Sequence, residues 1–369
     1  MFRESGADSP LSDVPREVGV SRGSPYGEAM RHAIDCARKG SARDANPRVG
    51  AVVLDKDGTF LADGFHRGAG TPHAEIDALA KLKPGHSRGT TVVVTLEPCD
   101  HTGKTGPCSD ALIAAGVSRV VYAVGDPGTR SGGGARTLTK AGVDTISGVL
   151  ADEASELIGD WLVAARLGRP FVTLKWASSL DGRVAAADGS SRWITGPDAR
   201  RRVHEQRADH DAIVVGIGTI LADDPSLTAR DPDGDLLVRQ PVPVVIGARP
   251  IPADAAIWRH PQPPIMVTEH DLDAALNTLW KRGMQRVFVE GGPTLASAFV
   301  AANLVDECAI YLAPTLLGGG AHALTDIGVS TITQQRTLEV VSTERIGGDF
   351  LVVARPAHHD APATIDTEN

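Results

Sequence analysis

The sequence predicts an α/β protein with two domains, and three observations support this prediction. Helical and extended apolar patterns alternate along most of the chain, which is typical of sheets covered by helices. The length of 369 residues exceeds the roughly 100–200 residues expected of one domain. A helical pattern ends near residue 168, just before an Arg-Pro pair, and the segments on its two sides share no motif.

Composition and pattern divide the chain into five parts. Both ends lack apolar periodicity, so we expect them to be flexible. The parts are a flexible tail at 1–24, an α/β domain at 25–150, a linking helix at 151–169, a second α/β domain at 170–356 and a flexible tail at 357–369.

The first domain opens with a helix. Met30, Ala33 and Ile34 recur at helical spacing, and Gly40 follows at the position of a C-terminal cap. A turn at 55–58 between two extended runs predicts a β-hairpin. The expected elements are a helix at 26–40, strands at 49–54 and 59–65, a helix at 73–82, a strand at 90–96, a helix at 107–116, a strand at 119–124, a closing pair at 135–142 and 143–150, and the linking helix, whose pattern runs over 152–168.

The second domain repeats the alternation with different segments. Its last two extended runs suggest an antiparallel pair at the edge of the sheet. The expected elements are a strand at 171–177, a helix at 196–208, strands at 211–217, 241–247 and 263–268, a helix at 272–283, a strand at 286–290, a helix at 293–303, and strands at 307–314 and 349–356.

Composition argues against several classes of protein. Hydrophobic residues make up 42% and charged residues 22%, close to the average of globular domains. The net charge of −9 disfavours nucleic acid as the main partner, and no apolar run approaches the ~20 residues that span a membrane. The N-terminus lacks the apolar centre of a signal peptide, and four cysteines are too few for a disulfide scaffold. We therefore expect a cytoplasmic protein.

Four residues in two helical patterns suggest a catalytic metal site. They are His73, Glu75, Cys99 and Cys108. One imidazole and two thiolates can hold zinc with a water in the fourth position. The order His-x-Glu followed by Pro-Cys and a second Cys is the signature of zinc deaminases, in which the glutamate moves protons and does not bind the metal.

The spacing of these residues constrains their geometry. Residues two apart on a regular helix point roughly 200° away from each other. His73 and Glu75 can converge only if His73, after Pro72, lies in the cap region before the helix. Cys108 follows Pro107 at an expected helix start, where free amide groups and the helix dipole favour a thiolate.

Simpler interpretations exist for each residue alone. A single histidine or cysteine is usually structural, and the cysteine pair alone could be half of a structural zinc site or two buried thiols. The full order, with a strand before Cys99 and a helix after Cys108, favours catalysis. Cys36, Cys308, His32 and His86 lack such a context, and we expect them to be core or surface residues.

The first half resembles the deaminase domain of the bifunctional riboflavin-biosynthesis deaminase/reductase family. The matching segments are 46–53, 64–79 and 95–116, including the eight-residue gap between the cysteines. The resemblance implies a cytidine-deaminase-like α/β/α sandwich with one Zn²⁺ per chain. It implies deamination of 2,5-diamino-6-(5-phosphoribosylamino)pyrimidin-4(3H)-one, with Glu75 as the catalytic proton carrier and His73, Cys99 and Cys108 as metal ligands. The substrate contacts that it implies are Asn46, His101, Lys104 and Thr105.

One loop departs from the family pattern. The family usually has Asp-Pro-Asn-Pro after the strand at 119–124, whereas this chain keeps Asp126-Pro127 and continues with Gly128-Thr129. The glycines at 132–134 suggest extra flexibility. This loop leaves open whether only one of the two domains is active.

The second half carries weaker signals of its own. The strand that ends at Glu290 is followed by two glycines and a helix, an arrangement that can bind a phosphate or merely join two elements. No GxGxxG follows the first strand, which disfavours a Rossmann domain.

Segments 174–196, 216–230 and 289–299 resemble the reductase domain of the same family. This resemblance implies a dihydrofolate-reductase-like α/β fold and NADPH-dependent reduction of the ribosyl group of 5-amino-6-(5-phosphoribosylamino)uracil. Lys175 and Asp181 lie in matching segments without an assigned role, and Ala248 stands where the family often has a small polar residue. The implied NADPH site consists of Ala177, Trp193, Thr219, Asp223, Gly292, Pro293, Thr294, Leu295, Ala296, Ser297 and Ala298. The implied substrate site consists of Ser191, Arg207, Leu227, Arg230 and Glu290. Of these, Arg207 and Arg230 suit the ribose phosphate by their chemistry, the alternative being that they form surface ion pairs.

The leading hypothesis is therefore a two-step enzyme of riboflavin synthesis, a zinc deaminase followed by an NADPH reductase. Its partners would be small pyrimidine ribosyl phosphates, with no nucleic acid and no membrane. The oligomeric state stays open, a homodimer being one option. The alternatives are a nucleic-acid deaminase with an appended domain, opposed by the acidic balance and the long loop between the cysteines, and a non-catalytic zinc- or nucleotide-binding module.

Overall fold

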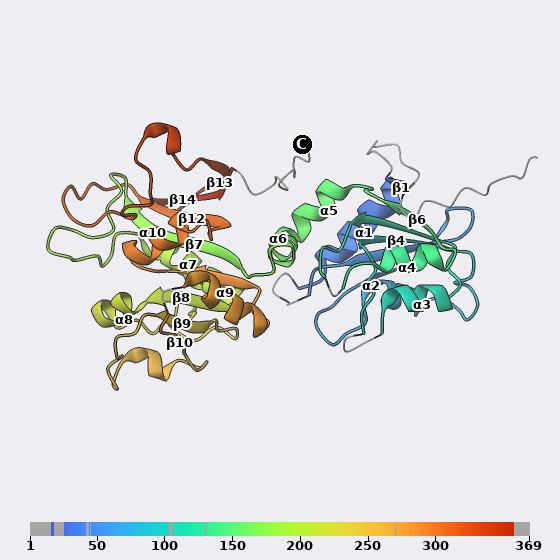
Figure 1. The fold of residues 1–369 in the computed structure, drawn as a ribbon, viewed down its shortest axis with the longest axis horizontal. Helices are drawn as coiled ribbons and strands as arrows, with labels where there is room; N and C mark the ends of the chain where they lie inside the picture. The colour runs from blue at the N-terminus through green and yellow to red at the C-terminus, as the bar shows by residue number, and fades with distance from the viewer. Residues whose placement is uncertain are drawn as a thin grey trace, which may run out of the picture. The chain divides into compact units, whose positions relative to one another are not determined.

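The computed structural model describes residues 16–17, 26–41, 44, 46–102, 106–129, 131–269 and 271–357. The chain divides into two compact units after Arg166 (Figure 1). Each unit contains one sheet with helices packed against it, so the predicted α/β class is confirmed.

The first unit follows the predicted order closely. Its elements are β1 (Arg16–Glu17), α1 (Gly27–Arg38), β2 (Gly50–Leu54), β3 (Phe60–Phe65), α2 (Ala74–Leu79), β4 (Thr91–Leu96), α3 (Cys108–Ala114), β5 (Arg119–Val124), α4 (Gly134–Lys140), β6 (Asp144–Ser147), α5 (Ala151–Leu157) and α6 (Gly159–Leu167). Three details differ from the expectation. The short strand β1 lies within the expected tail, helix α2 is shorter than its pattern, and the linking helix is two helices, α5 and α6.

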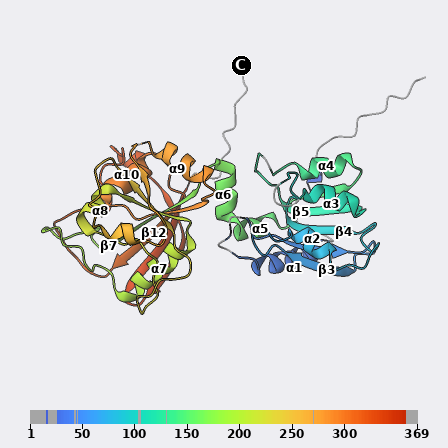
Figure 2. The same ribbon diagram turned by 90° about the horizontal axis from the view of Figure 1, so that it is seen from below.

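The sheet of the first unit is buried on both faces. In the described part of the chain its strand order is β1-β6-β5-β4-β2-β3, parallel from β1 to β4 and antiparallel from β4 to β3. Alternate residues of one strand enter opposite cores, Val93 with α1 and α5, and Val92 with α2, α3 and α4. The unit is thus an α/β/α sandwich, with α1 and α5 on one face of the sheet and α2, α3 and α4 on the other (Figure 1). Figure 2 shows this unit from the side of α2 and α3.

The second unit has a mixed sheet. Its elements are β7 (Phe171–Ser179), α7 (Pro197–Asp209), β8 (Ala212–Gly216), α8 (Ile217–Asp223), β9 (Val242–Ile246), the 3₁₀ helix η1 (Ala256–Arg259), β10 (Ile265–Val267), α9 (Leu272–Lys281), β11 (Arg286–Val289), α10 (Pro293–Ala301), β12 (Glu307–Ala313), the 3₁₀ helix η2 (Ile332–Gln334), β13 (Leu338–Ile346) and β14 (Asp349–Pro356). Among the described residues the strand order is β10-β9-β8-β11-β7-β12-β14-β13.

The edge of this sheet differs from the prediction. Strands β12 and β14 pair antiparallel as expected, but β13 covers β14 and forms the edge. Strand β13 is exposed along nearly its whole length, so its sequence carries no burial pattern that would have predicted it. Helix α8 was also not predicted.

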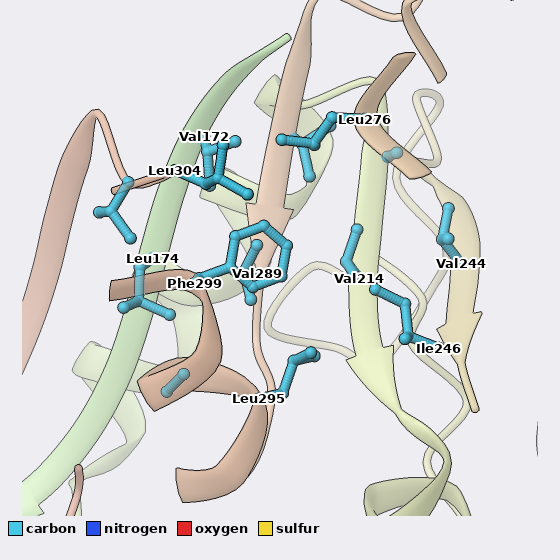
Figure 3. Packing of buried hydrophobic residues seen from close by; sticks show 14 of the residues in the cluster. Val172, Leu174, Val214, Val244, Ile246, Leu276, Val289, Leu295, Phe299 and Leu304 are labelled. Atoms are coloured by element: carbon cyan, nitrogen blue, oxygen red, sulfur yellow. The ribbon is translucent and has the colours of Figure 1, made fainter. Parts of the chain in front are cut away.

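Helices α9 and α10 pack on one face of the sheet. Phe299 and Leu295 of α10 lie against Leu174 of β7, Val289 of β11 and Val214 of β8 in one cluster (Figure 3). Helix α7 covers the other face through Ala199 and Val203. This packing fixes the start of α10 at the carboxyl ends of the parallel strands, the edge where open α/β sheets bind ligands.

Candidate functional site

The structure brings the three predicted metal ligands together. The ligand atoms of His73, Cys99 and Cys108 all lie within 4.8 Å of one another. His73 Nδ1 is 3.2 Å from Cys108 Sγ and 3.5 Å from Cys99 Sγ. One imidazole and two thiols at this spacing fit a tetrahedral zinc ion with one position left for water.

Local structure explains why these three residues converge. His73 has extended backbone angles as the N-cap of α2, and Cys108 is the first residue of α3. The prediction that His73 precedes the regular helix is therefore confirmed. Cys99 follows β4, and its sulfur accepts a hydrogen bond from the backbone N–H of Cys108 at 3.4 Å. The amide-rich starts of two helices thus face the site, which favours negative charge there.

The two sulfurs influence each other's charge. The contact with the Cys108 side chain lowers the pKa of the Cys99 thiol to about 4. The same contact, with burial second, raises the pKa of Cys108. The pair thus shares one negative charge, because two bare thiolates in contact repel each other. A divalent cation would stabilise both as thiolates, so the donor set fits zinc.

Glu75 lies at the same place and is almost fully buried. It sits in the first turn of α2 with 3% of its surface exposed. Burial raises the pKa of its carboxyl group, while the nearby His73 opposes this shift. A carboxyl group beside a metal-bound water is placed to accept and return protons.

Two carboxylates, Glu97 and Asp100, fix the loop that follows β4 by hydrogen bonds. The Asp100 carboxylate accepts hydrogen bonds from Ser109 Oγ at 2.6 Å and from Thr137 Oγ1 at 2.8 Å. Glu97 accepts from the backbone N–H of Asp126 at 3.0 Å and of Ala135 at 2.9 Å. These contacts fix Cys99 relative to α3 and α4.

The glycine run after Asp126 is required by packing. A Cβ on Gly134 would lie 1.9 Å from the Pro98 carbonyl oxygen, and one on Gly132 would lie 2.4 Å from that of Asp126. Gly133 has a φ of 101°, which side chains rarely adopt. Close backbone contacts at Gly132 and Gly134 and the positive φ of Gly133 thus explain the three glycines, and extra flexibility of the loop stays a prediction.

His66 is a site residue that the sequence analysis missed. It is 5% exposed, and its ring packs edge-on against His73 at a centroid distance of 5.2 Å. Its Nδ1 lies 3.0 Å from the Pro72 carbonyl, and its Nε2 lies 3.1 Å from Asn46 Nδ2. Since a carbonyl only accepts, Nδ1 carries the proton and Nε2 accepts from Asn46. His66 stands within the Gly-Phe-His segment of the resemblance, which was the available signal.

The other predicted substrate contacts of this unit are only partly placed. His101 is half-buried, and its buried Nδ1 has no hydrogen-bond partner among the described residues. Such an atom suits a bound ligand. Lys104 and Thr105 lie outside the described residues.

In the second unit the predicted substrate residues Arg207 and Glu290 form a bidentate ion pair. The distances are 2.6 Å from Nε to Oε1 and 2.9 Å from NH2 to Oε2. Lys175 Nζ of β7 lies 3.8 Å from Glu290 Oε2. Burial alone would raise the pKa of Glu290, but the two cations lower it to about 2. Burial lowers the pKa of Lys175. The cluster places three charges after β11, where β7 and α7 meet.

The predicted cofactor residues gather at the starts of α8 and α10. Gly292 is the N-cap of α10, and residues 293–298 form its first turns. A Cβ on Gly292 would lie 3.7 Å from Thr219 Oγ1 of α8. Ser297 differs from the expectation in its orientation, because it is 3% exposed and its Oγ accepts from the Thr325 N–H at 2.8 Å. Its side chain is therefore part of the packing.

Arg249 is a second residue that the sequence analysis missed. It is exposed, and its guanidinium NH2 lies 3.5 Å from the point where a Cβ on Gly218 would stand. Among the described residues it has no ion-pair partner. It follows Ala248, the position that departs from the family pattern, and so places a cation beside the start of α8.

The remaining predicted residues lie around these two features. Asp223 ends α8, and its carbonyl accepts from Arg192 NH2 at 2.7 Å. Trp193 is 69% exposed and lies beside the Arg200 guanidinium, 4.6 Å from the ring centroid. Ala177 is on β7, and Ser191 is exposed. Leu227 is buried and has a φ of 56°. Arg230 donates a hydrogen bond to Thr228 Oγ1 at 3.0 Å.

Comparisons with known proteins match both halves of the chain. The family of the cytidine and deoxycytidylate deaminase zinc-binding region matches residues 24–124, and the RibD C-terminal domain matches residues 170–352. The riboflavin biosynthesis protein RibD of Mycobacterium tuberculosis is 47% identical over 338 residues, covering 91% of this chain and 98% of that protein. The chain belongs to the RibD family.

Solved RibD structures share the architecture. A structure of Acinetobacter baumannii RibD has a TM-score of 0.79 and 36% identity, covering 90% of this chain and 99% of that one. The Thermotoga maritima diaminohydroxyphosphoribosylaminopyrimidine deaminase/5-amino-6-(5-phosphoribosylamino)uracil reductase has a TM-score of 0.70 and 35% identity, with the same coverage. This RibD family member is thus an enzyme of riboflavin biosynthesis with a zinc-binding deaminase domain and a reductase domain.

The RibD assignment agrees with the expected small-molecule substrates. Within the described ranges, no helix combines the length and apolar character needed to cross a bilayer.

Proposed function

We propose that the first unit deaminates 2,5-diamino-6-(5-phosphoribosylamino)pyrimidin-4(3H)-one and that the second reduces the product with NADPH. The main support for the proposed deamination is the convergence of His73, Cys99 and Cys108 beside the buried Glu75. A zinc ion held by these three ligands would supply a water of lowered pKa.

In this scheme Glu75 moves the protons. Its carboxylate would accept one proton from the water and deliver it to the ring nitrogen. It would then carry the proton of the newly added hydroxyl to the amino group, which leaves as ammonia as the carbonyl forms. Burial raises the pKa of the Glu75 carboxyl group, which favours its holding a proton between the two transfers and so supports this role. Asn46 would orient the pyrimidine, with its amide N–H held by His66 so that Oδ1 faces the substrate. His101, Lys104 and Thr105 would complete the pocket.

For the second step, the starts of α8 and α10 would bind NADPH. Gly292 lacks a side chain and faces the Thr219 hydroxyl, so a phosphate could approach the first amides of α10 beside a hydroxyl donor. NADPH carries the hydride, and the protein positions it against C1′ of the opened ribosyl group. Arg207, Arg230, Ser191, Leu227 and Glu290 would hold the substrate. The Glu290 carboxylate would keep Arg207 oriented while leaving Lys175 nearby.

A coupled assay tests both steps. The purified protein is given the diaminopyrimidinone phosphate, and ammonia is measured without NADPH. NADPH oxidation is then followed after its addition. We expect ammonia release in both conditions and NADPH oxidation only after deamination. Ammonia release without any NADPH oxidation would reject the reductase proposal alone, and the absence of ammonia release from the zinc-loaded protein would reject the deaminase proposal.

A further inference from the structure

A second set of metal-binding side chains lies in the first unit, away from His73, Cys99 and Cys108. His32 Nε2 is 2.8 Å from Asp63 Oδ2, and Cys36 Sγ is 3.4 Å from the same oxygen. All three ligand atoms lie within 4.8 Å of one another. Ligands of a tetrahedral zinc ion, at roughly 2.0–2.3 Å from the metal, stand roughly 3.3–3.6 Å apart.

The fold itself creates this arrangement. His32 and Cys36 are one helical turn apart on α1, so their side chains share a face of the helix. Asp63 lies on β3, the strand at the edge of the sheet, opposite Val52 of β2. Cys36 is buried at 1% exposure, whereas the side chains of His32 and Asp63 are 48% and 31% exposed. An ion could therefore enter from the solvent side and keep a water as its fourth ligand.

We propose that His32, Cys36 and Asp63 form a second divalent-metal site, which joins α1 to β3. One thiolate, one imidazole and one carboxylate are the donors that zinc accepts, and the sulfur disfavours magnesium and calcium. The site shares no ligand and no helix or strand with the deaminase triad. It therefore stands independently of the proposed function, and it raises the metal content from one to two ions per chain.

Two lysines compete with an ion at this place. Lys81 Nζ is 3.5 Å from Asp63 Oδ1, and Lys39 Nζ is 3.8 Å from Cys36 Sγ. Both lysines are exposed on flexible side chains, so they can move into solvent when a dication arrives. The competing interpretation is a hydrogen-bonded polar cluster that these lysines neutralise. The two interpretations differ in the number of metal ions bound.

Cobalt titration of the metal-free full-length protein, under reducing conditions, distinguishes them. Thiolate-bound Co²⁺ gives a near-ultraviolet charge-transfer absorption, so each site can be counted. We expect two equivalents for the wild type, and one for Cys36→Ala, His32→Ala and Asp63→Asn. We expect Cys99→Ala to lose the other ion and keep the one at Cys36. The control Cys308→Ala, a buried thiol of the second unit, should keep two.

The choice of variants also allows loss of the metal site to be distinguished from misfolding. His32→Ala and Asp63→Asn alter partly exposed side chains, so they leave the core intact even if Cys36→Ala does not fold. One equivalent in the wild type would overturn the proposal. Two equivalents retained in both His32→Ala and Asp63→Asn would overturn it equally. Loss of the ion from Cys99→Ala with no change in the Cys36 site would separate this inference from the proposed deaminase site.

Discussion

His73 Nδ1 lies 3.2 Å from Cys108 Sγ, although 35 residues separate the two in the chain. The contact exists because α2 and α3 both begin at the same end of the sheet, one after the hairpin and one after β4. Two helix starts and three ligand atoms therefore meet at one point. This relationship makes the role of the neighbouring Glu75 testable without disturbing the metal.

Replacing Glu75 by Gln should abolish deamination and spare zinc binding. The amide keeps the shape of the side chain but cannot accept a proton from water. We expect the deamination rate to fall by about 100- to 10,000-fold. Ammonia release and metal analysis of the same sample measure both effects. The NADPH-dependent step, assayed with the deaminated product, serves as the control. Full deamination in Glu75→Gln would refute the proton-carrier role.

Replacing His66 by Ala should weaken binding of the pyrimidine. The change removes the acceptor that orients the Asn46 amide, a hydrogen bond that contributes about 0.5–1.5 kcal/mol. We expect kcat/KM for deamination to fall about three- to tenfold, mainly through KM. His66→Gln, which restores an acceptor, should recover part of the loss, and the exposed His86→Ala should have no effect. An unchanged KM in His66→Ala would contradict this assignment.

Replacing Arg249 by Ala should reduce the preference for NADPH over NADH. Its guanidinium lies beside the start of α8 and has no ion-pair partner in the part of the chain that the structure describes, so it can bind the phosphate that distinguishes the two cofactors. We expect kcat/KM to fall about ten- to hundredfold with NADPH and to stay nearly constant with NADH. Arg282→Ala, an exposed arginine at the end of α9, is the matched control. Equal losses with both cofactors would indicate a structural effect.

Replacing Glu290 by Gln should destabilise the second unit. The change leaves Arg207 and Lys175 as uncompensated buried cations, which costs about 3–5 kcal/mol of unfolding free energy. Urea unfolding followed by tryptophan fluorescence reports this unit, since Trp176, Trp193, Trp258 and Trp280 lie in it. Glu205→Gln on α7, with an exposed ion pair, should cost less than about 1 kcal/mol.

The contribution of Glu290 to the free energy of unfolding should decrease as the pH falls. Its pKa is about 2 in the folded protein, against an ordinary value of 4.5. A carboxyl group whose pKa is lower in the folded than in the unfolded protein stabilises the folded state at pH values above its unfolded-state pKa. This stabilisation is lost as the pH falls towards 2. The difference in unfolding free energy between wild type and Glu290→Gln should be constant above pH ~5 and shrink below it. A difference that grows with acidification would contradict the ion-pair assignment.

The sequence alone predicted the fold class, most elements and the three side chains that converge as candidate metal ligands. Strands such as β4 and β5 are continuous apolar runs because both faces are buried, and this pattern is local. The deaminase ligands were also recognisable locally, since a proline and a helix start accompany both His73 and Cys108. The cap geometry of His73 followed from helix periodicity alone.

Only the tertiary structure decided the rest. The edge strand β13 is exposed along nearly its whole length, so its residues show no alternation of buried and exposed positions from which a strand could be predicted. The close approach of Gly134, the first residue of α4, to the Pro98 carbonyl is a contact between distant segments that the glycine run did not predict. His66 beside Asn46, Glu290 between Arg207 and Lys175, and Asp63 beside His32 and Cys36 are likewise long-range pairs. Local patterns encode which face of an element is buried, whereas the partner of a polar group depends on how the sheet brings distant elements together.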